Sequence, residues 1–259
     1  MKKALFCFGT RPETIKMSRL IQRSNEFGFE PIVCLTGQHR EMLTPFVKFF
    51  DLPVHKNLDI MTANQTLADI TGKVVTGISK IISEVNPDVF IIQGDTTTTF
   101  AGALASFYNK VPVAHVEAGL RTFDISSPFP EEANRQMTSA IAKFHFAPTE
   151  VSKGNLLKQG YSDHIYVTGN TSIDALDYTL GKIPKDNSKF PQIDFNKKII
   201  LVTCHRRENF GEPLDRIFNA LEKIKNKYQD VEIVFPVHLN PNVREKAFSK
   251  FADQKRVHL

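Results

Sequence analysis

The chain of 259 residues is long enough for one large domain or two smaller ones, and its 41% apolar and 24% charged residues are typical of a soluble globular protein. No apolar run approaches the roughly 18 residues that a membrane span needs, and the five apolar residues before Gly9 are too few for a secretory signal. The net charge of +5 comes from 33 basic residues spread along the chain, which favours a solvated surface over a nucleic-acid interface and fits an anionic small ligand equally well.

The first 180 residues alternate short apolar runs with helical patterns. Residues 67–85, for example, place apolar side chains at a spacing near 3.6. Apolar strands that alternate with amphipathic helices predict a parallel sheet covered on both faces, which is a doubly wound, Rossmann-like α/β domain over residues 1–180. Its strands are predicted at residues 4–8, 31–35, 89–92, 113–116, 144–147 and 165–167.

A second α/β pattern follows a linker. Residues 181–197 are rich in Lys, Pro, Asp and Asn and have no apolar period. Residues 198–259 then predict strands at 199–203 and 231–235, helices at 214–228 and 243–251, and the opening of a third strand at 256–259. A self-standing doubly wound domain normally has five or six strands, so we expect the second Rossmann-like domain to be incomplete in this chain. An interrupted gene, a shortened chain and a completing partner chain all fit this pattern.

The cysteines indicate a reducing compartment. Cys7, Cys34 and Cys204 are odd in number and form no Cys-x-x-Cys pair, and the first two lie in apolar strands, where cysteine acts as a small hydrophobic residue. We therefore expect a cytoplasmic protein.

The first polar motif, Gly9-Thr10-Arg11-Pro12-Glu13-Thr14-Ile15-Lys16, follows the first predicted strand. A helix that starts at Pro12 would bring backbone N–H groups to this turn, and Arg11 and Lys16 add positive charge there. The pattern is not Gly-x-Gly-x-x-Gly, so it does not predict a dinucleotide site. A phosphate or sugar-diphosphate contact and an ordinary turn with surface charges both fit.

The second motif, Gly94-Asp95-Thr96-Thr97-Thr98-Thr99, follows the strand at 89–92. An acid at the carboxyl end of a parallel strand lies where open α/β sheets bind ligands. Helix capping by Asp or Thr is the alternative, but four consecutive threonines exceed what a cap needs, so we favour a functional role.

The third motif places further acids at the same edge. His115-Val116-Glu117-Ala118-Gly119-Leu120-Arg121-Thr122 follows the next strand, and Pro130-Glu131-Glu132-Ala133-Asn134-Arg135 comes shortly after it. Glu117 and Glu131 would share a crevice with Asp95, an arrangement that is costly unless a ligand or cations compensate the charges. For Glu132 alone, the simpler explanation is an acid in the first turn of a helix.

The fourth motif, Thr203-Cys204-His205-Arg206-Arg207-Glu208-Asn209, follows the first strand of the second domain. His205 with the adjacent arginines suggests a base beside a diphosphate clamp, against the alternative of a charged surface turn. His238 follows the next strand, and His39 holds the corresponding place in the first domain. No pair has His-x-x-x-His spacing, so we expect no metal site.

Together these strings, in this order, resemble the non-hydrolysing UDP-N-acetylglucosamine 2-epimerases. The similarity runs from Gly9 to Pro241, and the combination is highly specific although each motif alone is weak. The resemblance implies the two-domain glycosyltransferase-B architecture, no cofactor, a homodimer, and a place in the synthesis of cell-surface polysaccharide precursors.

The resemblance also implies roles for individual residues. Asp95, Glu117 and Glu131 would be the acid/base carboxylates, with His205 near the diphosphate as a fourth catalytic residue. Arg11, Lys16 and Arg206 would join Asp95, Glu117 and His205 in binding the nucleotide sugar. A second site, for UDP-N-acetylglucosamine as an activator, would use Gln38, Glu41, Glu131, Arg206 and His238.

The sequence departs from the family pattern in two places. Asn64 stands where some members carry an arginine in the activator site, which leaves activation open. The Ser-Gly-Gly-x-x-Glu-Glu stretch that grips UDP in other members has no counterpart in these 259 residues, nor has the helix that crosses back to the first domain.

The implied reaction is inversion at C2 of UDP-N-acetylglucosamine to UDP-N-acetylmannosamine. Loss of UDP would acidify the C2 proton and give 2-acetamidoglucal, to which UDP adds back. Proton transfer at two faces requires more than one carboxylate, and carboxylates also stabilise positive charge at C1. The alternatives are an inactive nucleotide-sugar-binding remnant, a hydrolysing epimerase and a glycosyltransferase.

Overall fold

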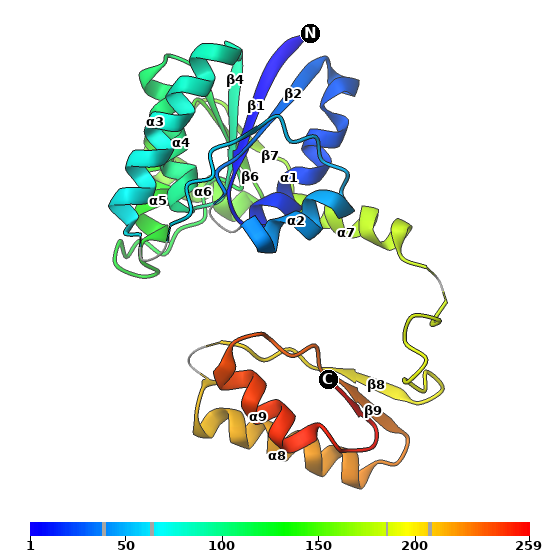
Figure 1. Cartoon of the computed structure of the whole chain (residues 1–259). Helices are drawn as coiled ribbons and strands as arrows, with labels where there is room; N and C mark the ends of the chain where they lie inside the picture. Colours follow the sequence, from blue (N-terminus) through cyan, green and yellow to red (C-terminus); the bar gives the residue numbers. More distant parts are fainter. Residues whose placement is uncertain (38–39, 63–64, 185, 207–208) are drawn as a thin grey trace. The chain divides into compact units, whose positions relative to one another are not determined.

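The computed structural model describes residues 1–37, 40–62, 65–184, 186–206 and 209–259. The chain divides into two compact units, Met1–Lys182 and Ile183–Leu259, each with its own sheet (Figure 1). The predicted Gln38, and the Asn64 position, lie outside the described residues. The same holds for the side chain of Glu41.

The first unit is built on a sheet of seven strands in the order β3-β2-β1-β4-β5-β6-β7. Every neighbouring pair is parallel, as the continuous apolar runs predicted. The strands are β1 (Lys2–Phe8), β2 (Phe29–Leu35), β3 (Lys56–Asn57), β4 (Val89–Gln93), β5 (Val113–Val116), β6 (Phe144–Ala147) and β7 (Ile165–Val167).

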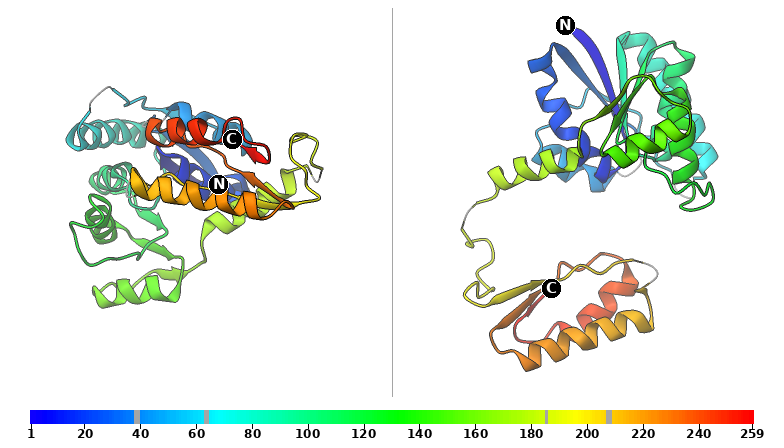
Figure 2. Two further views of the ribbon diagram at one scale, coloured as in Figure 1. Left: turned by 90° about the horizontal axis from the view of Figure 1, so that it is seen from below. Right: turned by 180° about the vertical axis from the view of Figure 1, so that it is seen from behind.

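Helices cover both faces of this sheet (Figures 1 and 2). One face packs against α1 (Arg11–Arg23), α2 (Arg40–Phe49) and α7 (Thr171–Lys182), and the other against α3 (Leu67–Val85), α4 (Thr97–Tyr108) and α5 (Glu131–Ile141). The 3₁₀ turn η1 (Ser24–Phe27) precedes β2, and α6 (Glu150–Lys158) connects β6 to β7. The doubly wound α/β prediction is confirmed for this unit.

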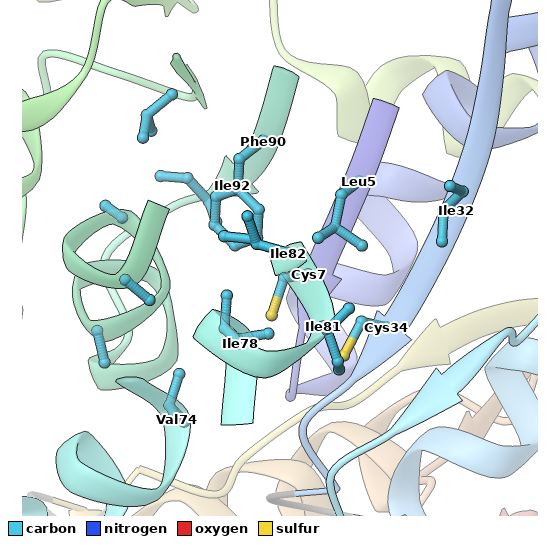
Figure 3. Packing of buried hydrophobic residues seen from close by; sticks show 14 of the residues in the cluster. Leu5, Cys7, Ile32, Cys34, Val74, Ile78, Ile81, Ile82, Phe90 and Ile92 are labelled. Atoms are coloured by element: carbon cyan, nitrogen blue, oxygen red, sulfur yellow. The ribbon is translucent and has the colours of Figure 1, made fainter. Parts of the chain in front are cut away.

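The core between the sheet and α3 shows why the strands are apolar on both sides. Leu5 and Cys7 of β1 alternate with Phe6 and Phe8, so the first pair faces α3 while the second faces α1 and α2. Figure 3 shows Ile78 of α3 among the labelled side chains of β1, β2 and β4. Each face of the sheet therefore buries its own set of side chains. The alternation along each strand determines which face each side chain points to.

The chain order creates a topological switch point between β1 and β4. After β1 the chain adds β2 and β3 on one side, and it then returns to add β4 on the other side of β1. The connection after β1 enters α1 on one face, whereas the connection after β4 enters α4 on the opposite face. Such a switch point is where open α/β sheets bind ligands, and the first two polar motifs lie there.

The second unit has a smaller sheet in the order β10-β9-β8, again parallel. Its elements are β8 (Lys198–Leu201), α8 (Glu212–Lys227), β9 (Val231–Val234), α9 (Pro241–Phe251) and β10 (Val257–His258). Both helices pack on one face, around Phe218, Phe235 and Phe251. On the opposite face Leu201 is 70% exposed.

Some elements differ from the sequence predictions. Strand β8 ends at Leu201, short of the predicted end at residue 203. Strand β3 was not predicted, because its two residues, Lys56 and Asn57, are polar and form no apolar run. Helix α7 runs through Gly181 and Lys182, into the stretch predicted as linker. At the other end of that stretch Ile193 is buried, and the N–H of Asp194 donates to Glu232 of β9.

Candidate active site

A buried carboxylate joins the two turns that flank the switch point. Glu13, only 2% exposed, accepts hydrogen bonds at Oε2 from the N–H groups of Gly9 (3.0 Å) and Thr10 (2.7 Å). Its Oε1 accepts from the hydroxyls of Thr96 (2.7 Å) and Thr99 (3.2 Å). Sequence reasoning missed this role, although Thr10-x-x-Glu13 is a capping-box signature that identifies the helix start.

Lys16 is part of a polar cluster rather than a free surface charge. Its Nζ lies 2.5 Å from Glu117 Oε2, and the side chains are 23% and 12% exposed. Gln93, at the end of β4, donates to the same oxygen at 2.9 Å. Arg11 is exposed and lies over the ring of Phe46 at 5.8 Å. The start of α1 thus supplies one cation, Lys16, to this polar cluster and another, Arg11, to the surface.

Asp95 is held by α5. Arg135 donates to Asp95 Oδ2 from Nε (3.0 Å) and from Nη2 (2.6 Å), and Asn134 donates to the Asp95 carbonyl (2.9 Å). His115 Nε2 bonds the carbonyl of Gly94 at 2.7 Å. The Asp95 side chain is 28% exposed, so the carboxylate is both restrained and accessible.

The threonine run after Asp95 is mainly structural. Thr96 is the N-cap of α4 and accepts from the N–H of Thr99. Thr99 in turn donates to the carbonyl of Gln93, and Thr97, Thr98 and Thr99 are all buried. Thr96 and Thr99 do more than cap the helix, because both also donate to Glu13. The functional role favoured for the run stays a prediction.

The turn after β5 has a constrained backbone. Glu117 has φ of 66°, in the left-handed region that non-glycine residues rarely adopt, and such strain is concentrated at functional sites. Gly119 has φ of 89°, and a Cβ there would lie 2.2 Å from the carbonyl oxygen of Ser152. Only glycine fits this second position, so α6 packs directly against the turn.

The consecutive acids at the start of α5 have different surroundings. Glu131 is half-buried, and among the residues that the structure describes no hydrogen bond or ion pair holds its carboxylate. Glu132 is fully buried and accepts from the N–H groups of Thr122 (3.0 Å) and Phe123 (3.3 Å) and from Gln136 (3.0 Å) and Arg135 (3.2 Å).

These donors decide the charge of Glu132. Burial by itself would raise the pKa of this carboxyl, but the hydrogen bonds from Gln136, from the backbone of Thr122 and from Arg135 outweigh it and hold the pKa below its usual range. The simple interpretation of Glu132 as a first-turn acid is therefore incomplete, because α5 uses it to tie down the loop before the helix.

Two buried histidines stay neutral near this edge. Burial lowers the pKa of His115 on β5, and of its neighbour His145 on β6, to about 4. A neutral His115 that donates from Nε2 to Gly94 leaves Nδ1 without a proton, and this atom has no partner in the described part of the chain. His115 therefore acts as a fixed donor to the turn that carries Asp95.

The remaining predicted residues lie in the second unit. The rings of His205 and His238 stack with centroids 5.2 Å apart and planes 18° apart. His238 Nδ1 accepts from the N–H of Asn240, and His205 Nδ1 lies 3.4 Å from the hydroxyl of Thr203. Arg206 is exposed. The structure thus brings together two histidines that the sequence assigned to different sites.

Within the described ranges, no group of three or more His, Cys, Asp or Glu side chains is arranged to hold a metal ion. None of the described helices is long and apolar enough to cross a bilayer. The three cysteines are buried and unpaired.

Comparison with known proteins assigns the family. A profile described as UDP-N-acetylglucosamine 2-epimerase matches residues 21–259. The chain belongs to this family. The UDP-N-acetylglucosamine 2-epimerase of Bacillus subtilis is 48% identical over 261 residues, which cover 99% of this chain and 68% of that protein. The Escherichia coli K12 enzyme of the same name is 48% identical over 94% of this chain and 67% of its own length.

Solved structures agree with this assignment. The Neisseria meningitidis UDP-GlcNAc 2-epimerase bound to UDP-GlcNAc superposes with a TM-score of 0.88 at 44% identity, covering 99% of this chain and 71% of that one. MurG of Acinetobacter baumannii has a TM-score of 0.55 at 13% identity, which is a likeness of fold alone. The family and the glycosyltransferase-B-like α/β class predicted from the sequence are therefore confirmed.

Proposed function

We propose that this epimerase-family chain interconverts UDP-N-acetylglucosamine and UDP-N-acetylmannosamine by inversion at C2. The observation that carries the proposal is the pair of restrained acids, Asp95 and Glu117, at the carboxyl ends of the adjacent strands β4 and β5. The binding of UDP-GlcNAc in the Neisseria meningitidis relative supports the same substrate here.

The hydrogen bonds of Asp95 and Glu117 leave one oxygen of each carboxylate available to the substrate. In each, one oxygen is occupied: Oδ2 of Asp95 by Arg135, and Oε2 of Glu117 by Lys16 and Gln93. The second oxygen of each accepts no hydrogen bond from the described residues, so it remains available for a sugar proton or for the positive charge that develops at C1. Two such groups can serve the two faces of C2.

The departing UDP requires positive charge nearby. We assign Arg11 and Lys16, beside the start of α1, to the nucleotide sugar, together with His205 and Arg206 of the second unit. Glu131, which has no partner among the described residues, completes the acid/base set. We also propose an activator site, which is formed by Glu131, Arg206, His238, Gln38 and Glu41.

We further propose that the protein is a cytoplasmic homodimer and that it supplies precursors for cell-surface polysaccharides.

Exchange with solvent tests the elimination route. With UDP-N-acetylglucosamine in D₂O, we expect UDP-N-acetylmannosamine that carries one deuterium at C2, because the C2 proton is removed and a solvent deuteron is delivered to the other face. Proton NMR of the product measures this, with Asp95→Asn as the control that should form product at least about 100-fold more slowly. Product with protium retained at C2 would defeat the route. Release of free N-acetylmannosamine would indicate a hydrolysing epimerase.

The alternative function is nucleotide-sugar binding without turnover. The chain spans 68% of the length of its Bacillus subtilis relative. Calorimetric titration with UDP-N-acetylglucosamine, run beside the exchange assay, separates the two functions. Binding without product would support the second candidate, whereas product formation would exclude it.

A further inference from the structure

Arg135 connects two carboxylates. Two of its donors, Nε and Nη2, converge on Asp95 Oδ2 at 3.0 and 2.6 Å, while Nη1 donates to Glu132 Oε2 at 3.2 Å. The guanidinium is planar, so its donors point in fixed directions. Its side chain is only 15% exposed, and the direction from which it approaches Asp95 is therefore set by whatever fixes its other end.

Glu132 is the fixed end. With no exposed side-chain surface, it accepts four hydrogen bonds, two at each oxygen: Thr122 and Arg135 at Oε2, and Phe123 and Gln136 at Oε1. Two of these donors are backbone N–H groups of the loop after β5. A carboxylate held from both oxygens cannot rotate without breaking buried hydrogen bonds, which is costly.

The rest of the Asp95 turn is held independently. His115 on β5 holds the Gly94 carbonyl, and Asn134 on α5 holds the Asp95 carbonyl. The backbone is thus anchored by two elements, and Arg135 controls the side chain. Of the oxygens of Asp95, only Oδ1 receives no hydrogen bond from the residues that the structure describes.

The chain of contacts places one guanidinium between two carboxylates, so negative charge is in excess. An arginine that faced Asp95 alone would neutralise that carboxylate. Glu132 offsets part of the positive charge of Arg135 from the far side, so Arg135 orients Asp95 through hydrogen bonds while the acid keeps negative charge. The lowered pKa of Glu132, due to its hydrogen-bond donors after the opposing effect of burial, keeps this counter-charge in place at neutral pH.

We propose that Glu132 and Arg135 are positioning residues of Asp95, and that the Glu132–Arg135–Asp95 chain selects Oδ1 as the oxygen that meets the sugar. The chemical part of this inference rests on the proposed function. The orientation part concerns contacts within the first unit and is testable without turnover.

Nitrogen-15 NMR of the arginine side chains tests the orientation in the whole chain. The Nε–H signal of Arg135 is expected to shift in Asp95→Asn and also in Glu132→Gln, because each variant removes one end of the guanidinium contacts. Glu150→Gln, at an exposed first-turn acid of α6, is the matched control and should leave the signal unchanged. An Arg135 signal that is insensitive to Glu132→Gln would overturn the proposal.

A double-mutant cycle tests the coupling to chemistry. Misplacement of a catalytic group commonly costs about 10- to 100-fold in rate, so Glu132→Gln should lower kcat by about that factor while KM stays the same. In the Asp95→Asn background the same substitution should cost nothing further, because Glu132 acts only through Asp95. An equal loss in both backgrounds would mean that Glu132 merely stabilises the loop, and the proposal would fall.

Two further arms keep the test decisive. If Glu132→Gln does not fold, Arg135→Lys preserves the charge without the forked donors and is expected to show the same loss of kcat, again absent beside Asp95→Asn. If the unmodified chain shows no turnover, the proposed function fails for it, and the NMR shifts then decide whether Glu132 orients Arg135.

Discussion

Adjacent residues of one type have opposite surroundings in this protein. Glu131 and Glu132 both begin α5, yet among the described residues the first has no hydrogen-bond partner and the second has four. The difference comes from the direction in which each side chain leaves the helix. Glu132 points to the loop and to Arg135, whose donors satisfy it completely. A carboxylate's role at this edge therefore depends on the donors that the fold brings to it.

At the residue scale, the acid/base assignment predicts a particular kinetic pattern. Asp95→Asn, Glu117→Gln and Glu131→Gln should each lower kcat by about 100-fold or more, with little change in nucleotide affinity, because they remove proton transfer and not UDP contacts. Steady-state kinetics and calorimetric binding of UDP measure the two effects. Glu150→Gln is the exposed control. Retained turnover in all three variants would remove them from the acid/base role.

His115 supplies a prediction of pH dependence. Its folded-state pKa of about 4 lies below the ordinary 6.5, so the unfolded chain binds the proton more readily than the folded one between these values. The contribution of His115 to stability is therefore complete above pH 6.5 and is lost as the pH falls towards 4. Nitrogen-15 NMR should show a neutral ring, protonated at Nε2, from pH 8 to pH 5. A titration midpoint near 6.5 would contradict this.

At the scale of elements, most strands were predictable and β3 was not. Strands β5, β6 and β7 have the predicted bounds, because each is a mainly apolar run between polar residues, interrupted in β5 and β6 by one histidine. Strand β3 contains two residues and depends on β2 for its hydrogen bonds. The carboxyl ends of β4 and β5 were likewise predictable as the place of the acids, because a parallel sheet collects such ends at one edge.

A pair of glycines tests how the elements pack. Gly119→Ala combines a φ of 89° with a Cβ 2.2 Å from the Ser152 carbonyl oxygen, so it should lower the free energy of unfolding by about 2 kcal/mol or more. Gly154→Ala in α6 meets no atom within 4 Å and should raise it by about 0.5–1 kcal/mol. Urea unfolding of both variants checks this. Equal effects at the two positions would refute the close contact between α6 and the turn after β5.

At the scale of the whole molecule, the two units differ in how their sheets are covered. The first buries both faces of a seven-stranded sheet beneath helices. The second has three strands, with helices on one face and a 70% exposed Leu201 on the other. Parallel sheets are normally covered on both faces, so the second unit has fewer apolar contacts to stabilise it.

Separate expression of the units tests this difference. Residues 1–182 alone should fold cooperatively, because the two cores of the first unit lie within that range. Residues 183–259 alone should show a broad transition at most. Thermal unfolding followed by circular dichroism measures both, with the 259-residue chain as the reference. A sharp transition for the second piece at the temperature of the first would contradict the prediction.

The sequence by itself determined the doubly wound fold of the first unit, the family, and the edge of the sheet where the acids lie. These features follow from local periodicity and from the order of short motifs along the chain. The partners of the acids were decided only by the tertiary structure. Lys16 meets Glu117 across 101 positions, Thr96 meets Glu13 across 83, and Arg135 meets Asp95 across 40. Such contacts depend on how strands are ordered in the sheet, and no local pattern records that order.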